Sequence, residues 1–142
     1  MGRSAMFDAV FSPFKIKDVE IRNRVVFQAS IPLNASGDGN VTREMIAYYR
    51  RIAKGGAGVV VIGDSAVDFE YARDHTRQLN LGRDEVIAGL SELVEEIHRQ
   101  GALASIEVNH AGRMASPRFI GRNPIGPSPI PAKMEQEWIK MF

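Results

Sequence analysis

The chain of 142 residues contains no cysteine and only three histidines, which restricts its chemistry before any motif is considered. Without cysteine, this chain forms no disulfide, no thiolate nucleophile and no cysteine-ligated cluster. The histidines are His75, His98 and His110, and no two of them have the spacing of metal ligands. We therefore expect no metal site here, and we expect His75 to be a solvated loop residue.

Neither sign of charge dominates, and no hydrophobic run is long. Lysine and arginine number 18 against 17 acidic residues, so the net charge is +1, and the two signs are interspersed. Such a surface has no field that would recruit nucleic acid or an anionic membrane. No apolar run reaches the roughly 18 residues of a membrane span, and the first residues lack the apolar core of a signal peptide. We expect a cytoplasmic protein that binds a small-molecule substrate, with no nucleic-acid and no membrane partner.

What the chain does contain is an alternation of strand and helix patterns. Three short apolar runs, over residues 25–30, 59–62 and 103–108, are typical of strands buried on both faces. Thr42 is expected to cap a helix that ends at Gly55-Gly56, and Asp84 to cap a second helix that ends at Gly101. The expected buried residues are Met45, Ile46, Tyr49, Ile52 and Ala53 on the first helix and Ile87, Leu90, Val94 and Ile97 on the second.

Ahead of the first strand, residues 14–23 alternate apolar and polar side chains around Lys17-Asp18. This pattern indicates a small two-stranded hairpin with one solvated face.

The order strand, helix, strand, helix, strand favours parallel strands joined by right-handed crossovers, and two α/β architectures fit it. A doubly wound nucleotide-binding sheet places its glycine-rich turn after a strand, whereas the glycines of residues 54–58 follow a helix and precede a strand. A TIM (β/α)8 barrel fits better, because all three strands become small or polar at their C-terminal ends, where such barrels bind ligands. The clearest case is the third strand, which leads into the sequence Asn109-His110-Ala111-Gly112-Arg113.

A barrel of this kind takes about 250 residues and eight strands, so about three strands form only part of it. We expect residues 1–142 to be an N-terminal fragment of a barrel domain, with a flexible terminus over 1–6. Residues 114–142 are expected to form a loop, proline-rich over 123–131, with a candidate helix start at Glu135. Arg24 is expected to brace the base of the barrel. Because the sheet has unpaired edges, we expect a homo-oligomer or association with a complementary chain.

An ordered set of motifs resembles one known family. The motifs are Phe11-Ser-Pro-Phe-Lys-Ile16, Ile21-Arg-Asn-Arg-Val-Val26, Asp38-Gly-Asn-Val-Thr42, Tyr48-Tyr49, Ala53-Lys-Gly-Gly-Ala-Gly-Val59 and His110-Ala-Gly-Arg113. In this order they resemble the N-terminal part of the old yellow enzyme family. More narrowly, they are similar to the branch of NADH:flavin oxidoreductases that includes 2,4-dienoyl-CoA reductase and clostridial enoate or bile-acid reductases.

The resemblance implies a flavin barrel that binds FMN, accepts hydride from NAD(P)H and passes it to an activated carbon–carbon double bond. It also implies site residues by position. The implied cofactor contacts are Ala29, Ser30, Ile31 and Pro32 after the first strand, Gly63 and Asp64 after the second, and Glu107 on the third. The implied substrate contacts are His110 and Arg113.

Two positions depart from the family pattern. The family commonly has glutamine where this chain has Glu107, and an ionised glutamate accepts hydrogen bonds but does not donate them. We hypothesise that Glu107 accepts from the flavin N3–H, or is protonated and donates to a carbonyl, because an unpaired buried carboxylate is costly. Asp64 stands where many relatives have alanine or glycine, which adds a second carboxylate near the flavin.

The family's substrate-activating pair, tyrosine proton donor and phosphate-binding segments have no counterpart in these residues, so we assign no catalytic residue. Any iron–sulfur cluster would lie in the missing portion. We interpret the chain as part of an FMN-dependent ene-reductase for an α,β-unsaturated carbonyl or acyl thioester, inactive alone. Two alternatives stay open: a non-catalytic partial barrel that self-associates or complements another chain, and a different phosphate-binding barrel enzyme with the same strand pattern.

Overall fold

The computed structural model describes residues 7–130 and 132. A short helix, α1 (Asp8–Phe11), precedes the antiparallel strands β1 (Phe14–Ile16) and β2 (Val19–Ile21), which confirms the hairpin around Lys17-Asp18. The expected flexible terminus over 1–6 and the helix start at Glu135 lie outside the described residues.

The centre of the molecule is a four-stranded parallel sheet. Strand β6 (Leu103–Asn109) pairs along one edge of β4 (Val59–Ala66), while β3 (Val26–Phe27) and β5 (Leu79–Asn80) pair with the start and the end of the other edge. The three expected strands are therefore present and parallel. Their bounds differ, because the first is shorter than expected and the second continues past Ile62 to Ala66. The short strand β5 was not expected.

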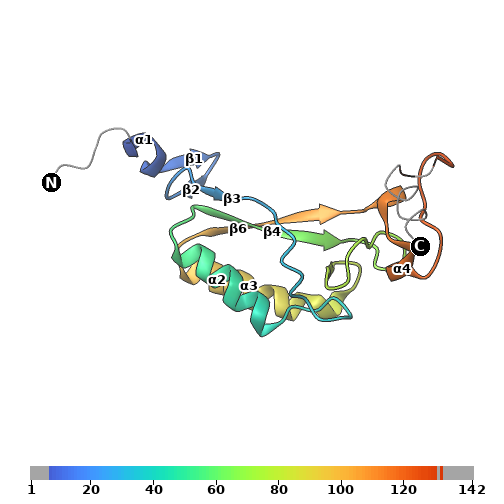
Figure 1. The fold of residues 1–142 in the computed structure, drawn as a ribbon. Helices are drawn as coiled ribbons and strands as arrows, with labels where there is room; N and C mark the ends of the chain where they lie inside the picture. Colours follow the sequence, from blue (N-terminus) through green and yellow to red (C-terminus); the bar gives the residue numbers. More distant parts are fainter. Residues whose placement is uncertain (1–6, 131, 133–142) are drawn as a thin grey trace.

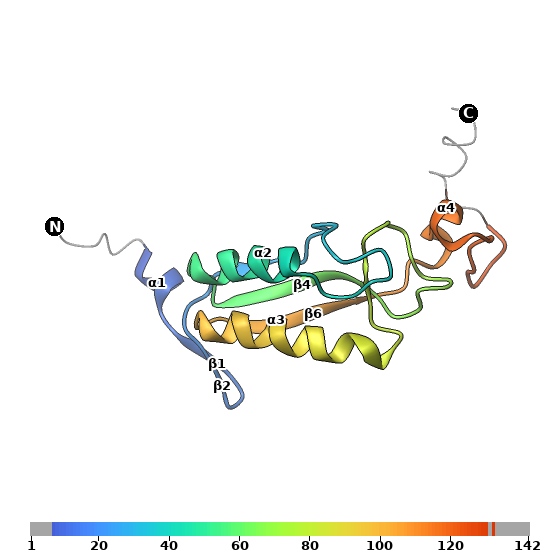
Figure 2. The same cartoon turned by 90° about the horizontal axis from the view of Figure 1, so that it is seen from below.

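Two helices lie side by side across one face of this sheet (Figures 1 and 2). Helix α2 (Arg43–Lys54) is capped as expected, since the Thr42 side chain accepts a hydrogen bond from the Met45 N–H at 3.1 Å. Helix α3 spans Ile87–Arg99, and a short 3-10 helix over Asp84–Val86 precedes it.

The expected cap at Asp84 is wrong, because Asp84 lies inside the 3-10 helix and makes no side-chain cap. This turn puts Val86 on the buried side of the helix and leaves the next residue, Ile87, 56% exposed. Leu93 and Ile97 continue the buried stripe at helical spacing. Ile87 was therefore wrongly expected in the core, and Leu93 was missed.

The core lies between the two helices and the sheet, and it uses only one face of each strand. Val60 and Ile62 of β4 belong to this core, and Ala104 and Ile106 of β6 pack against it. Because side chains alternate along a strand, Val61, Gly63, Ser105 and Glu107 face the opposite side of the sheet. No helix of the described part covers that side (Figure 1).

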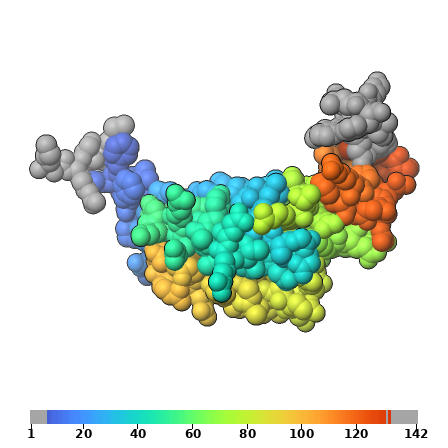
Figure 3. Space-filling view, turned by 60° about the horizontal axis from the view of Figure 1, so that its bottom comes forward, coloured from blue at the N-terminus to red at the C-terminus, as the bar shows by residue number. Residues whose placement is uncertain are grey.

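The space-filling view shows an elongated molecule, with the N-terminal hairpin region at one end and residues 111–130 at the other (Figure 3). A last helical turn, α4 (Pro117–Ile120), belongs to the latter end. Among the described residues, no helix is both long and apolar enough to cross a membrane.

One arginine, next to the hairpin, contacts the C-terminal ends of both α2 and α3. The Arg22 guanidinium donates to the carbonyl oxygens of Ala53, Ala57 and Gln100, at 2.6 to 3.1 Å. Arg24, which we expected in this role, is exposed and stacks its guanidinium 5.0 Å from the centre of the Phe14 ring. The expectation for Arg24 was wrong, because Arg22 rather than Arg24 donates to the carbonyl groups at the base of this layer.

We predict that Arg22→Met lowers the free energy of unfolding by about 2–3 kcal/mol, because three carbonyl groups lose a charged donor. Urea unfolding followed by far-UV circular dichroism measures this loss. The matched control is Arg24→Met, which removes only an exposed cation–π contact and should cost about 1 kcal/mol or less. Equal losses in the two variants would contradict the bracing role of Arg22.

Candidate functional site

Three residues from three separate elements meet on the uncovered side of the sheet. Ala29 follows β3, Gly63 lies in β4, and Glu107 lies in β6. A Cβ atom built on Gly63 would be 2.7 Å from the Ala29 Cβ and 3.0 Å from the Glu107 Oε2. The structure therefore brings together three of the residues singled out from the sequence.

Glycine at position 63 is required by this close approach. Real Cβ atoms essentially never come within 3.0 Å of another heavy atom, so any side chain at this position would push the β3 loop or β6 away. The small residues Ala29 and Gly63 thus form a shallow floor, and the carboxyl group of the exposed residue Glu107 stands beside it. This arrangement suits a flat ligand that needs one polar contact at its edge.

A buried tyrosine of α2 holds the backbone of Gly63 in place. The Tyr49 hydroxyl donates to the Gly63 carbonyl oxygen at 3.0 Å and accepts from the Gly63 N–H at 3.1 Å. The pairing of β4 with β6 shifts register between Ile62 and Ser65, so this segment leaves the regular ladder. The Tyr49 hydroxyl satisfies both backbone groups of Gly63 inside the core.

The sequence identified Tyr49 as a core aromatic but not this contact. The sequence did offer one signal for this contact: a tyrosine expected in the core needs a hydrogen-bond partner for its hydroxyl group. Burial raises the pKa of Tyr49 to about 12.

The Asp64 side chain has different neighbours. Its carboxyl group is 7% exposed, and its Oδ2 accepts a hydrogen bond from Gln78 Nε2 at 2.7 Å. Burial, followed by the nearby charge of Asp74, raises the pKa of Asp64. His75, expected to be solvated, is partly buried, and its Nδ1 lies 3.7 Å from the same Asp64 oxygen.

The remaining residues singled out from the sequence lie around this centre. Ser30, Ile31 and Pro32 continue the loop after β3, and the Ser30 Oγ is 3.4 Å from the Tyr48 hydroxyl. His110 and Arg113 are exposed and lie beyond the end of β6. His110 Nδ1 accepts the Gly112 N–H at 3.0 Å, and Arg113 lies in a 3-10 turn over Gly112–Met114.

We predict that Tyr49→Phe lowers the free energy of unfolding by about 1–3 kcal/mol, because it leaves two buried backbone groups of Gly63 unpaired. Tyr48→Phe is the matched control, since the Tyr48 hydroxyl has only a long contact with Ser30. The control should change stability by no more than about 0.5 kcal/mol. Similar urea midpoints for the two variants would show that the Gly63 contact contributes little.

The raised pKa of Tyr49 also predicts a pH dependence. The usual value is 10.0, and the folded value is about 12, so the folded chain favours the neutral phenol. The resulting stabilisation is fully present below pH 10 and disappears as the pH rises through about 12. The stability difference between wild type and Tyr49→Phe should therefore shrink over this range, and a constant difference would contradict the shift.

Comparison with known proteins places this chain in a family. The family model described as "NADH:flavin oxidoreductase / NADH oxidase family" matches residues 9–140. A NADH oxidase from Thermoanaerobacter brockii is 36% identical over 126 residues, which cover 88% of this chain and 19% of that protein. A NADH:acrylate oxidoreductase from Vibrio harveyi is 39% identical over 115 residues, covering 80% of this chain and 11% of that protein.

The structure of the old yellow enzyme from Trypanosoma cruzi matches with a TM-score of 0.79 at 25% identity. The match covers 91% of this chain and 37% of that one. The chain thus spans about a fifth or less of the first two relatives and about a third of this TIM-barrel neighbour. The resemblance stated from the motifs is confirmed: the chain belongs to the NADH:flavin oxidoreductase / NADH oxidase family.

Proposed function

We propose that this chain forms one wall of an FMN site in an NAD(P)H-dependent oxidoreductase that reduces an activated carbon–carbon double bond. The family uses FMN with NAD(P)H as reductant, which supports the cofactor assignment. The observation that carries the proposal is the meeting of Ala29, Gly63 and Glu107 on one side of the sheet. They lie toward the C-terminal ends of parallel strands, where TIM barrels place their ligands.

The residues at this meeting point fit a flavin ring. Ala29 and Gly63 project almost no side chain, so a planar ring system could approach the backbone closely. Glu107 offers a carboxyl group beside this floor for a polar atom at the ring edge. Residues 30–32 extend the same loop and are proposed to continue the contact along the ring. When bound, FMN would supply the acceptance and donation of hydride.

Glu107 has two ways to serve such a ring. As a carboxylate it accepts a hydrogen bond from a ring N–H, and as a carboxylic acid it donates one to a ring carbonyl. Glutamine, common at this position in the family, does both at once. Whether Glu107 is ionised or protonated in this chain determines the charge next to the cofactor.

The substrate class is proposed from the family and from one relative. The Vibrio harveyi relative is named a NADH:acrylate oxidoreductase, and acrylate carries an α,β-unsaturated carboxyl group. We assign an α,β-unsaturated carbonyl compound or acyl thioester to this protein, with His110 and Arg113 as substrate contacts. Both side chains are exposed just beyond β6, as such a role requires.

The rest of the barrel must complete the site. In the described part, β6 pairs only with β4, so its other edge is unpaired. No helix of that part covers the side of the sheet that carries Ala29, Gly63 and Glu107 (Figure 1). We propose that residues 1–142 are the N-terminal part of a flavin-binding barrel domain, inactive alone. Further strands would come from the same polypeptide, from a complementary chain or from a second copy. A cytoplasmic location remains a prediction.

An FMN titration of a polypeptide that contains this chain and the complete barrel tests the function. Gly63→Val should weaken FMN binding at least about tenfold, or 1.4 kcal/mol, because its side chain would enter the floor. Glu107→Gln should raise the flavin midpoint potential by on the order of 30 mV if the native side chain is ionised, because a negative charge disfavours reduction. Ser105→Ala, on the same side of β6, is the control and should change neither quantity.

Unchanged FMN affinity and potential in both site variants would reject the proposed site. An absorbance spectrum with light scattering tests the alternatives on the purified chain. A colourless oligomer would favour a non-catalytic partial barrel. A bound phosphorylated ligand without flavin would favour a different barrel enzyme.

A further inference from the structure

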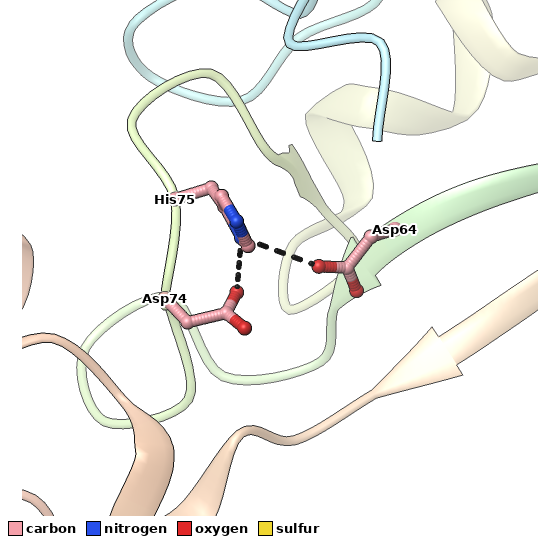
Figure 4. A group of neighbouring side chains, drawn as sticks. All are labelled: Asp64, Asp74 and His75. Atoms are coloured by element: carbon pink, nitrogen blue, oxygen red, sulfur yellow. Dashed lines mark hydrogen bonds and ion pairs between the residues drawn. The ribbon is translucent and has the colours of Figure 1, made fainter. Parts of the chain in front are cut away.

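Three ionisable side chains gather at the C-terminal end of β4, away from the Ala29–Gly63–Glu107 floor. Figure 4 shows the Asp64 carboxyl group pointing from β4 toward His75 and Asp74, which lie on the loop between β4 and β5. His75 Nδ1 is 2.8 Å from Asp74 Oδ1 and 3.7 Å from Asp64 Oδ2. One ligand atom from each residue can be chosen such that all three lie within 4.8 Å of one another.

Asp64 is the unusual member of this group. Its side chain is more than nine-tenths buried, and its Oδ1 has no hydrogen-bond partner within the described residues. A buried carboxylate oxygen without a partner is costly, because water no longer solvates it. The oxygen that faces His75 is Oδ2, so a cation held by both oxygens of this carboxyl group would also satisfy Oδ1.

Nearby arginines do not neutralise the two carboxylates. Arg77 pairs with Glu44, and Arg73 donates to the Phe119 carbonyl and stacks on Phe69. In the described part of the chain, the ion pairs of Asp64 and Asp74 are with His75 alone. The cluster therefore carries an excess of negative charge.

A buried glutamine fixes the relative position of the three residues. Gln78 is 2% exposed, and its Nε2 donates to Asp64 Oδ2. Its Oε1 accepts from the backbone N–H groups of Asp74 at 3.2 Å and His75 at 3.4 Å. Gln78 thus joins the strand to the loop, as outer-shell residues do when they orient the ligands of a metal.

We propose that Asp64, Asp74 and His75 bind a first-row divalent cation such as Zn²⁺, Mn²⁺ or Fe²⁺. Two carboxylate oxygens and one imidazole nitrogen are a donor set that these ions accept. Bond lengths of about 2.0–2.2 Å place neighbouring ligand atoms about 3.0–3.5 Å apart. His75 Nδ1 is 2.8 and 3.7 Å from the two carboxylate oxygens, and the three ligand atoms lie within 4.8 Å of one another, so small side-chain movements would close the site around an ion. Because Asp74 and His75 are 24% and 35% exposed, water can complete the coordination sphere.

This inference uses no residue of the Ala29–Gly63–Glu107 floor, and it gives Asp64 a role other than the cofactor contact that the family resemblance implies. It goes against our expectation of no metal site, which rested on the spacing of histidines along the sequence. The ligands are separated by ten residues, and the loop before β5 brings them together only in the fold.

Cobalt binding to the purified full chain, freed of metal with a chelator, tests the proposal. We expect one Co²⁺ per chain, a ligand-field absorption spectrum that Zn²⁺ abolishes by competition, and a higher melting temperature with either ion. His75→Asn and Asp64→Asn should each weaken Co²⁺ binding at least tenfold. His98→Asn, which removes an exposed histidine of α3, is the matched control and should bind Co²⁺ like the wild type.

Several outcomes would overturn the proposal. They are no saturable binding of Co²⁺, Zn²⁺ or Mn²⁺, binding that His75→Asn leaves unchanged, or equal loss in His75→Asn and His98→Asn. Far-UV circular dichroism checks that each variant is folded. If Asp64→Asn fails to fold, His75→Asn decides the question, because its side chain is partly exposed on a loop.

Discussion

The paired hydrogen bonds between the Tyr49 hydroxyl and Gly63 are the contact on which the candidate site depends. Gly63 lies where β4 loses its regular pairing with β6, and both of its backbone groups are turned into the core. Without Tyr49 these groups would be buried and unpaired. By fixing Gly63, helix α2 also fixes the distance between the β3 loop and β6, because Ala29 and Glu107 flank this residue.

The opposite end of the sheet is fixed in a comparable way by Arg22. Its guanidinium connects the hairpin with carbonyl groups at the ends of α2 and α3 and with the Ala57 carbonyl between α2 and β4. Unpaired carbonyl groups are a general feature of helix ends, and a charged donor satisfies them well. The two contacts act at opposite ends of the same helix–strand layer. The layer can therefore hold its strand tips in place although one face of the sheet is uncovered.

The sequence predicted the repeating parts of this fold and missed contacts that depend on its three-dimensional arrangement. Hydrophobic periodicity located the helices and the three main strands, and Thr42 located the start of α2. Asp84 resembles a cap in the sequence, but a 3-10 turn ahead of α3 changed which residues face the core. Family resemblance identified Ala29, Gly63 and Glu107. Composition and spacing alone did not, because their proximity depends on pairing between distant strands.

The register shift in β4 explains how the adjacent residues Gly63 and Asp64 contact different parts of the molecule. In a regular strand, Gly63 and Asp64 would simply face opposite sides of the sheet. Here the ladder is interrupted at both residues, which leaves the Asp64 carboxyl group free to contact Gln78 and His75 near β5 while Gly63 faces Glu107. The resemblance assigned both residues to one cofactor surface by position, although Asp64 departs from the alanine or glycine of many relatives. A buried carboxylate at that position needs partners of its own, and the loop before β5 supplies them.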